Sequence, residues 1–117
     1  LLLRADPGGG RLTVGASGTR SPWLPELHRL GEAVERACRR LDPAFRRVNL
    51  EILGNTDGFL HAHVWPRYEW EPADLVGMPV WLYPRERWTD ERFALKPRHD
   101  VVREAIGEEL DLLATAE

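Results

Sequence analysis

The sequence predicts an α+β fold, in which one long helix packs on an antiparallel sheet and a second helix closes the chain. Apolar residues recur at steps of three and four from Leu24 to Leu41, and again after Asp100, which is the period of an amphipathic helix. Between these segments, alternating apolar residues in Val48–Ile52 and Phe59–Trp65 flank a run rich in glycine and asparagine. This pattern is typical of a β-hairpin.

Length and composition bound the class of protein. The chain has 117 residues, so we expect a single domain spanning residues 1–117. The formal net charge of -3 gives no reason to expect nucleic acid as a partner, and no apolar run is long enough for a membrane span. Cys38 is the only cysteine, which excludes an internal disulfide and favours a reducing, cytoplasmic location. Since the chain begins on an aliphatic run without methionine, we expect part of an N-terminal segment to be missing.

The N-terminal elements follow from local composition. Leu1–Arg4 is expected to be a strand remnant, ended by the turn residues of Asp6–Gly10. Thr13–Pro22 has no period and is expected to be a mobile loop. The helix then begins near Leu24, with Pro25 in its first turn, and ends before Pro43. Its apolar stripe consists of Leu27, Leu30, Val34, Ala37, Cys38 and Leu41.

The C-terminal part is expected to be less regular until its last helix. Residues 72–98 are rich in aromatic residues and proline, which indicates an extended segment over the sheet, with a short strand at Val80–Tyr83. The final helix is expected to begin near Asp100. Its apolar stripe consists of Val102, Ile106, Leu110 and Leu113.

The hairpin places its two histidines on one face. Side chains alternate along a strand, so His61 and His63 lie opposite the aliphatic set of Leu60, Ala62 and Val64. If the hairpin closes around Thr56, Glu51 opposes His61 and Asn49 opposes His63. We therefore expect both imidazoles to line a groove that solvent can reach.

Spacing alone leaves three uses open for His61 and His63. Same-face neighbours on a strand are about 6.6–6.8 Å apart, which suits two metal ligands, a nucleophile with its electrostatic partner, or two structural imidazoles. A cupin-like metal motif would draw on Gly54, His61, His63, Glu69 and Gly77. A zinc site would need a third or fourth ligand, for which His99 or Glu69 are the candidates.

The hairpin resembles the histidine-triad (HIT) superfamily, and more narrowly its bacterial diadenosine polyphosphate hydrolase-like branch. The resemblance rests on the residues of 48–68, in which Asn-Leu-Glu-Ile-Leu-Gly-Asn is followed by Phe-Leu-His-Ala-His and by Pro66-Arg67-Tyr68. Aligned on that last tripeptide, the three triad positions are Phe59, His61 and His63. The resemblance implies a HIT-like sheet and a homodimer in which central helices and strands of two copies pair.

The resemblance also implies a reaction. His61 would attack the α-phosphorus of a dinucleoside polyphosphate or a related nucleotide, without cofactor or metal, and water would hydrolyse the nucleotidyl-histidine. His63 would hold a phosphate oxygen or protonate the leaving group. Asn49 and Asn55, together with Phe59, would contact the substrate. Glu51 is a candidate for orienting an imidazole, which is an inference from the hairpin geometry.

Phe59 departs from the triad, because phenylalanine cannot hydrogen-bond where the family has its first histidine. An alternative is therefore a catalytically weakened nucleotide-binding or dimeric interaction protein. A metal-dependent cupin-like enzyme is the second alternative.

Other candidate residues have simpler roles. We expect His28 to be solvated, His99 to support the start of the last helix and Cys38 to be a small core residue. The five tryptophans are expected in the core or at an interface. Arg67 is expected to attract anionic substrate, whereas Arg85 and Arg87 are expected to be solvated basic residues.

Overall fold

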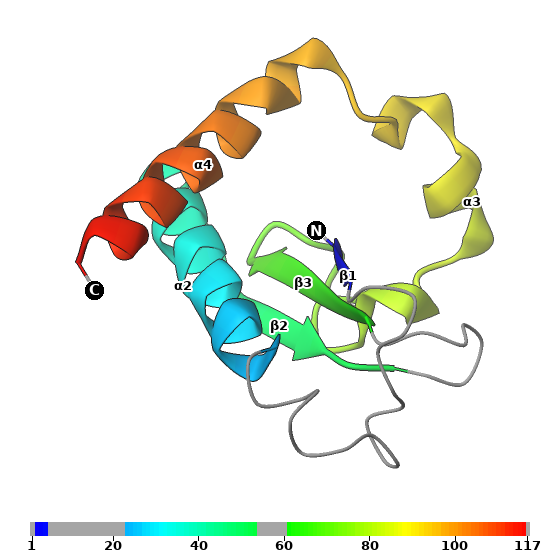
Figure 1. Ribbon diagram of the computed structural model, residues 1–117. Helices are drawn as coiled ribbons and strands as arrows, with labels where there is room; N and C mark the ends of the chain where they lie inside the picture. The colour runs from blue at the N-terminus through cyan, green and yellow to red at the C-terminus, as the bar shows by residue number, and fades with distance from the viewer. Residues whose placement is uncertain (1, 5–22, 54–60, 117) are drawn as a thin grey trace.

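The computed structural model describes residues 2–4, 23–53 and 61–116 (Figure 1). The order of elements confirms the predicted α+β class, with a long helix before the sheet and another after it. The strands are β1 (Leu2–Arg4), β2 (Phe45–Glu51) and β3 (His61–Tyr68). The α-helices are α2 (Trp23–Leu41), α3 (Arg85–Thr89) and α4 (Asp100–Thr115), and the 3-10 helices are η1 (Val80–Leu82), η2 (Glu91–Phe93) and η3 (Pro97–His99).

Helix α2 has the limits that the sequence predicted to within one residue, and Pro25 lies in its first turn. It ends at Leu41 because Asp42 precedes Pro43, and the residue before a proline is disfavoured in the helical conformation. The Asp42 carboxylate accepts a hydrogen bond from the Ala44 N–H at 2.8 Å, and the Phe45 N–H donates to the Asp42 carbonyl at 3.0 Å. This turn leads the chain directly from the helix into β2.

The sheet has the strand order β1-β3-β2, so β3 lies between two antiparallel neighbours. The predicted N-terminal strand is confirmed, and Arg4 pairs with His61. Strand β2 begins at Phe45, three residues before the predicted start, and contains a register shift between Phe45 and Arg47. The histidines therefore lie on the central strand of the described sheet.

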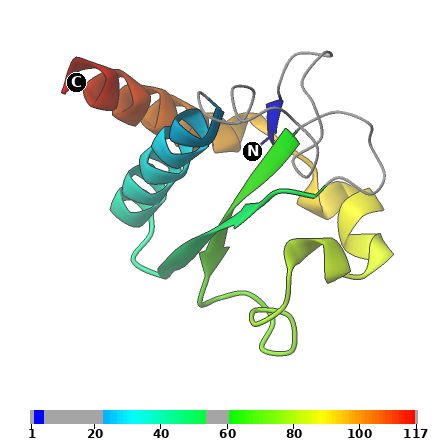
Figure 2. The ribbon, with the colours of Figure 1, turned by 60° about the horizontal axis from the view of Figure 1, so that its bottom comes forward.

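The two long helices lie on one side of the sheet, as the turned view shows (Figure 2). Helix α2 packs on β2 and β3, and α4 packs on α2. Ala62 and Val64 of β3 are fully buried in the core beneath α2, and Cys38 is buried there as predicted. The other buried apolar residues of this core are Trp23, Leu27, Leu30, Ala33, Val34, Ala37, Ala105 and Ile106.

The predicted starting point and apolar stripe of the last helix are confirmed. Helix α4 begins at Asp100, buries Ile106, and packs Val102, Leu110 and Leu113 against the core. None of the helices in the described part of the chain combines the length and apolar character needed to cross a membrane.

The prediction of a strand at Val80–Tyr83 is wrong. This run forms η1, in which the Leu82 N–H donates to the Pro79 carbonyl and the Tyr83 N–H to the Val80 carbonyl, both at 3.0 Å. Pro79 and Pro84 flank it, and proline has no N–H to offer a neighbouring strand. Short helices therefore replace the extended segment expected for residues 72–98, and they form the arc that joins the sheet to α4 (Figure 1).

Candidate functional site

The two hairpin histidines share the face of β3 that points away from α2, as predicted. Their ring centroids are 5.4 Å apart and the rings meet edge to face. His63 also stacks on Trp65, with centroids 5.5 Å apart and an interplanar angle of 12°. The face thus carries a continuous row of rings, His61, His63 and Trp65, while Ala62 and Val64 occupy the core side.

The predicted cross-strand pairs are wrong by two residues. Glu51 pairs with His63 instead of His61, and Asn49 pairs with Trp65 instead of His63. A shift by two residues keeps every side chain on its predicted face, because side chains alternate with a period of two. The structure therefore brings Glu51 beside the histidines but moves Asn49 one pair further along the strand.

Glu51 contacts the neighbouring indole. Its carboxylate accepts a hydrogen bond from Trp65 Nε1 at 3.1 Å, and it makes no hydrogen bond to His63. The proposed direct orientation of an imidazole by Glu51 is thus not seen. Glu51 instead binds the indole on which the His63 imidazole stacks.

The prediction that solvent reaches both imidazoles holds for only one of them. His63 is half-buried, but His61 is buried, with 5% of its surface exposed. His61 therefore offers less accessible surface to a ligand than His63 does. Two other predicted site residues, Asn55 and Phe59, lie outside the described residues, as does the turn centred near Thr56.

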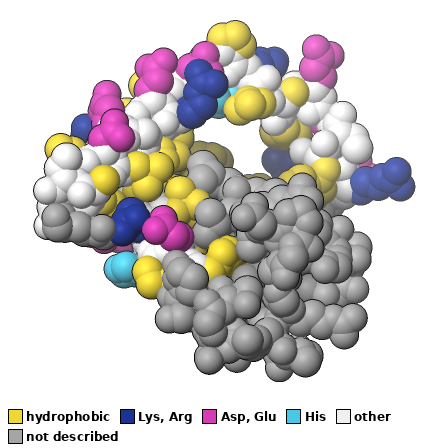
Figure 3. All heavy atoms as spheres, in the orientation of Figure 1, with side chains coloured by type: hydrophobic (Ala, Val, Ile, Leu, Met, Phe, Trp, Pro, Cys, Tyr) yellow, Lys and Arg dark blue, Asp and Glu magenta, His cyan; other side chains and the backbone are white. Residues whose placement is uncertain are grey.

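An aromatic cavity of about 480 Å³ adjoins the row of rings. Trp88 of α3 approaches Trp65 with centroids 6.1 Å apart, which connects the arc to the histidine face. Figure 3 shows hydrophobic side chains along the inner side of this arc, around an opening. The aromatic residues that line the cavity are Trp65, Tyr68, Trp70, Tyr83, Trp88 and Phe93.

The tryptophans divide between core and surface. Only Trp23 belongs to the described core, whereas Trp70, Trp81 and Trp88 are more than half exposed. The sequence prediction of core or interface positions is therefore confirmed for Trp23. The exposed indoles are grouped on the segment from Trp70 to Trp88, which makes this part of the surface unusually aromatic.

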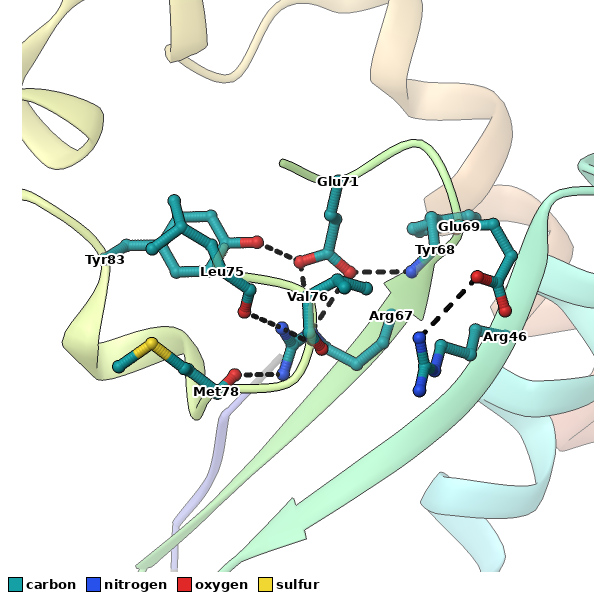
Figure 4. Close-up of polar contacts among 9 residues, drawn as sticks. All are labelled: Arg46, Arg67, Tyr68, Glu69, Glu71, Leu75, Val76, Met78 and Tyr83. Carbon is teal, nitrogen blue, oxygen red and sulfur yellow. Dashed lines mark hydrogen bonds and ion pairs between the residues drawn. The ribbon is translucent and has the colours of Figure 1, made fainter. Parts of the chain in front are cut away.

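Arg67 is a buried structural residue, so the prediction that it attracts substrate is wrong. Its exposed fraction is 2%, and its Nε donates to both Glu71 carboxylate oxygens at 3.1 Å (Figure 4). Its Nη1 donates to the Met78 carbonyl at 2.6 Å, and its Nη2 to the carbonyls of Leu75 and Val76, each at 3.1 Å. The guanidinium thus holds the loop after β3 against the sheet.

Glu71 is the central acceptor of this cluster, although no pattern in the sequence distinguishes it from other glutamates. It also accepts hydrogen bonds from the Tyr68 N–H at 2.7 Å and from the Tyr83 hydroxyl. Burial acts to raise the pKa of Glu71, but hydrogen bonds from Arg67, Tyr83 and the Tyr68 backbone outweigh burial and leave the pKa lowered. Burial and the adjacent Glu71 raise the pKa of Tyr83.

The remaining candidate residues have local roles. His28 is solvated as predicted, with its imidazole 3.9 Å from Glu32. The His99 Nδ1 accepts from the Lys96 N–H at 2.8 Å, so it supports the 3-10 turn just before α4. Arg85 and Arg87 are exposed, and Arg87 lies over the Phe93 ring at 4.8 Å.

Residues 23–53 and 61–116 contain no set of side chains that could bind a metal ion. No group of three or more histidine, cysteine, aspartate or glutamate side chains in the described chain could hold an ion. Glu69, which a cupin-like site requires, instead lies 3.6 Å from Arg46.

No protein-family model, no curated protein and no solved structure matches this chain.

Proposed function

We propose that the protein is a nucleotidyl hydrolase or transferase that acts on the α-phosphate of dinucleoside polyphosphates or related nucleotides, as a member of the HIT superfamily. The observation that carries the proposal is the edge-to-face pair of His61 and His63 on the side of the sheet opposite α2. Two adjacent imidazoles can divide nucleophilic attack and proton transfer between them. The adjoining aromatic cavity has the chemistry to stack a nucleobase.

In the proposed reaction, a ring nitrogen of His61 attacks the α-phosphorus and the bond to the leaving phosphate oxygen breaks. His63 donates a proton to that oxygen, a role worth about 10²–10⁴-fold in rate in other enzymes. Water then attacks the nucleotidyl-histidine, which releases the nucleoside monophosphate and restores the imidazole. In the transferase variant an acceptor hydroxyl replaces water.

A second candidate function is nucleotide binding without efficient turnover. The observation that favours it is the 5% exposure of His61, because a nucleophile must reach phosphorus. The phenylalanine at the first triad position points the same way, since it cannot support the nucleophile through a hydrogen bond. In this candidate the half-buried His63 and the aromatic cavity bind the ligand and no phosphoryl bond breaks.

Turnover of diadenosine tetraphosphate by the full chain tests the first candidate. We expect His61→Ala to abolish hydrolysis, His63→Ala to slow it by about 10²–10⁴-fold, and the solvated His28→Ala to leave it unchanged. Because no metal is required, activity should survive a chelator. Undiminished hydrolysis by His61→Ala would show that the nucleophile is assigned wrongly.

Calorimetric titration with AMP and ATP distinguishes the two candidates. Binding without turnover supports the second, and then Phe59→His should raise the hydrolysis rate by restoring the first triad position. A protein that neither binds nor hydrolyses any of these nucleotides contradicts both candidates.

A further inference from the structure

Two consecutive arginines line the same side of β2 because the strand carries one extra residue. Phe45 pairs with Tyr68 and Arg47 pairs with Arg67, so Arg46 has no partner position on β3. Such a β-bulge re-aims side chains, whereas neighbours in a regular strand point to opposite faces. Arg46 and Arg47 therefore both reach one cavity.

This cavity has a volume of about 220 Å³ and is separate from the aromatic one. Asn49 lines it from the sheet, two residues beyond Arg47 and so on the same face. The loop that Arg67 holds in place, from Val76 to Pro79, forms its other wall. Because a water molecule occupies about 30 Å³, the cavity has room for a ligand of several heavy atoms.

The charges around the cavity do not cancel. Arg67 is neutralised by Glu71, and Arg46 lies 3.6 Å from Glu69 (Figure 4). The Arg47 side chain is exposed, and its guanidinium forms no hydrogen bond or ion pair with any residue that the structure describes. The half-buried Asn49 amide likewise has no partner among residues 23–53 and 61–116. One guanidinium charge and one amide are thus available to a ligand.

We propose that Arg46, Arg47 and Asn49 form a binding site for a phosphate group on a small anionic ligand. A guanidinium presents a planar fork of donors that matches the oxygens of a phosphate, and the Asn49 amide adds a neutral donor. The Arg46–Glu69 pair leaves part of the Arg46 fork free for the ligand, because the pair joins at a single nitrogen. The site stands on these contacts alone and does not require that His61 react.

Calorimetric titration of the full chain with inorganic phosphate, pyrophosphate and tripolyphosphate tests this site. We expect Arg47→Gln to weaken binding by about tenfold or more, since a hydrogen bond to a charged group is lost. The matched control is Arg85→Gln, which removes another exposed arginine outside this cavity and should leave binding unchanged. Circular dichroism verifies that both variants keep the fold.

A second variant tests the cavity from its other wall. Gly77 lines it, a Cβ there would meet nothing within 4 Å, and its φ is not positive, so a side chain fits without strain. Gly77→Glu adds a negative charge and should also weaken binding by about tenfold. Comparison of AMP and ATP with inorganic phosphate shows whether the phosphate belongs to a nucleotide or is free.

Equal affinities for Arg47→Gln and Arg85→Gln overturn the site, as does the absence of binding of all three anions to the unaltered chain at millimolar concentration. Either result is independent of hydrolysis at His61. A failure of this proposal and a failure of the proposed function can therefore be told apart.

Discussion

At the scale of single residues, the most consequential arrangement is the buried ion pair of Arg67 and Glu71, where β3 meets the loop that follows it. Breaking a buried ion pair by removing one partner leaves an uncompensated charge, so each of these side chains depends on the other. Arg67 also satisfies three backbone carbonyls of the loop that follows β3. This loop forms one wall of the small cavity, and its position therefore depends on the Arg67 guanidinium.

The replacement of Arg67 tests this dependence. Arg67→Ala should lower the free energy of unfolding by about 3–5 kcal/mol, because Glu71 is left buried without its cation. Arg67→Lys should recover only part of this loss, since an ammonium cannot reproduce the planar fork of donors. Urea denaturation measures the free energy of unfolding of both variants. The control is Arg103→Lys, which alters an exposed ion pair of α4 and should change this free energy little. A small loss in Arg67→Ala would contradict the structural role.

Glu71 predicts how stability depends on pH. Since its pKa is lowered in the folded protein, its contribution is fully present above the ordinary glutamate pKa of about 4.3 and is lost as the pH falls through the folded value. We expect the free energy of unfolding to decline as the pH falls below about 5, and Glu71→Gln to flatten this decline. Urea titrations between pH 3 and pH 7, with Glu86→Gln as the surface control, measure the slope. An unchanged slope in Glu71→Gln would assign the acid sensitivity elsewhere.

At the scale of elements, the sequence predicted the helices better than the strand pairs, for a physical reason. The apolar stripe of α2, which includes Leu27, Leu30 and Val34, extends over about five turns, so its helical period is unambiguous. A hairpin register depends instead on the turn, and a slip of two residues leaves every face unchanged. The faces of Glu51 and His63 were therefore predictable, but their pairing was not.

Other features were not predictable because their partners have no sequence signature. Arg67 is fixed by backbone carbonyls, which every residue possesses, so nothing in the sequence distinguished it from a substrate-binding arginine. The apolar run Val80–Leu82 is too short for its period to separate a strand from a 3-10 turn, although its flanking prolines were a usable signal. The β-bulge at Arg46 is defined by how β2 pairs with β3, so no local sequence pattern predicts it.

Two helix glycines give a test at this scale. At Gly107 of α4 a Cβ would meet nothing within 4 Å, so Gly107→Ala should stabilise the protein by up to about 1 kcal/mol. At Gly31 of α2 a Cβ would lie 3.1 Å from Leu50 Cδ2, so Gly31→Ala should gain less, because the leucine must shift. Thermal denaturation compares the two variants. A larger gain at Gly31 than at Gly107 would contradict the packing of α2 on β2.

At the scale of the whole molecule, the homodimer stays a prediction that the resemblance implies. Strand β2 lies at the edge of the described sheet, and its Leu50 is 48% exposed beside a cavity of about 490 Å³ between α2 and β2. An exposed strand edge with apolar side chains is a surface that a second copy can extend.

Sedimentation velocity measures the oligomeric state and so tests this prediction directly. We expect the unaltered chain to sediment as a dimer and Leu50→Asp to sediment as a monomer, because a buried carboxylate opposes the contact. Leu112→Asp alters a leucine of α4 with a similar exposure of 57% and should remain dimeric. A monomeric unaltered chain at micromolar concentration would show that the β2 edge does not join two copies.

The extra residue at the start of β2 has a consequence for how this protein can diverge. Deletion of Arg46 would place Phe45 next to Arg47 in an uninterrupted ladder, and it would leave every pair from Arg47–Arg67 to Glu51–His63 in register. Phe45 would keep its edge-to-face contact with Tyr68. We therefore expect the loss of Arg46 to remove one cationic group from the small cavity while the pairing of the strands above the core stays unchanged.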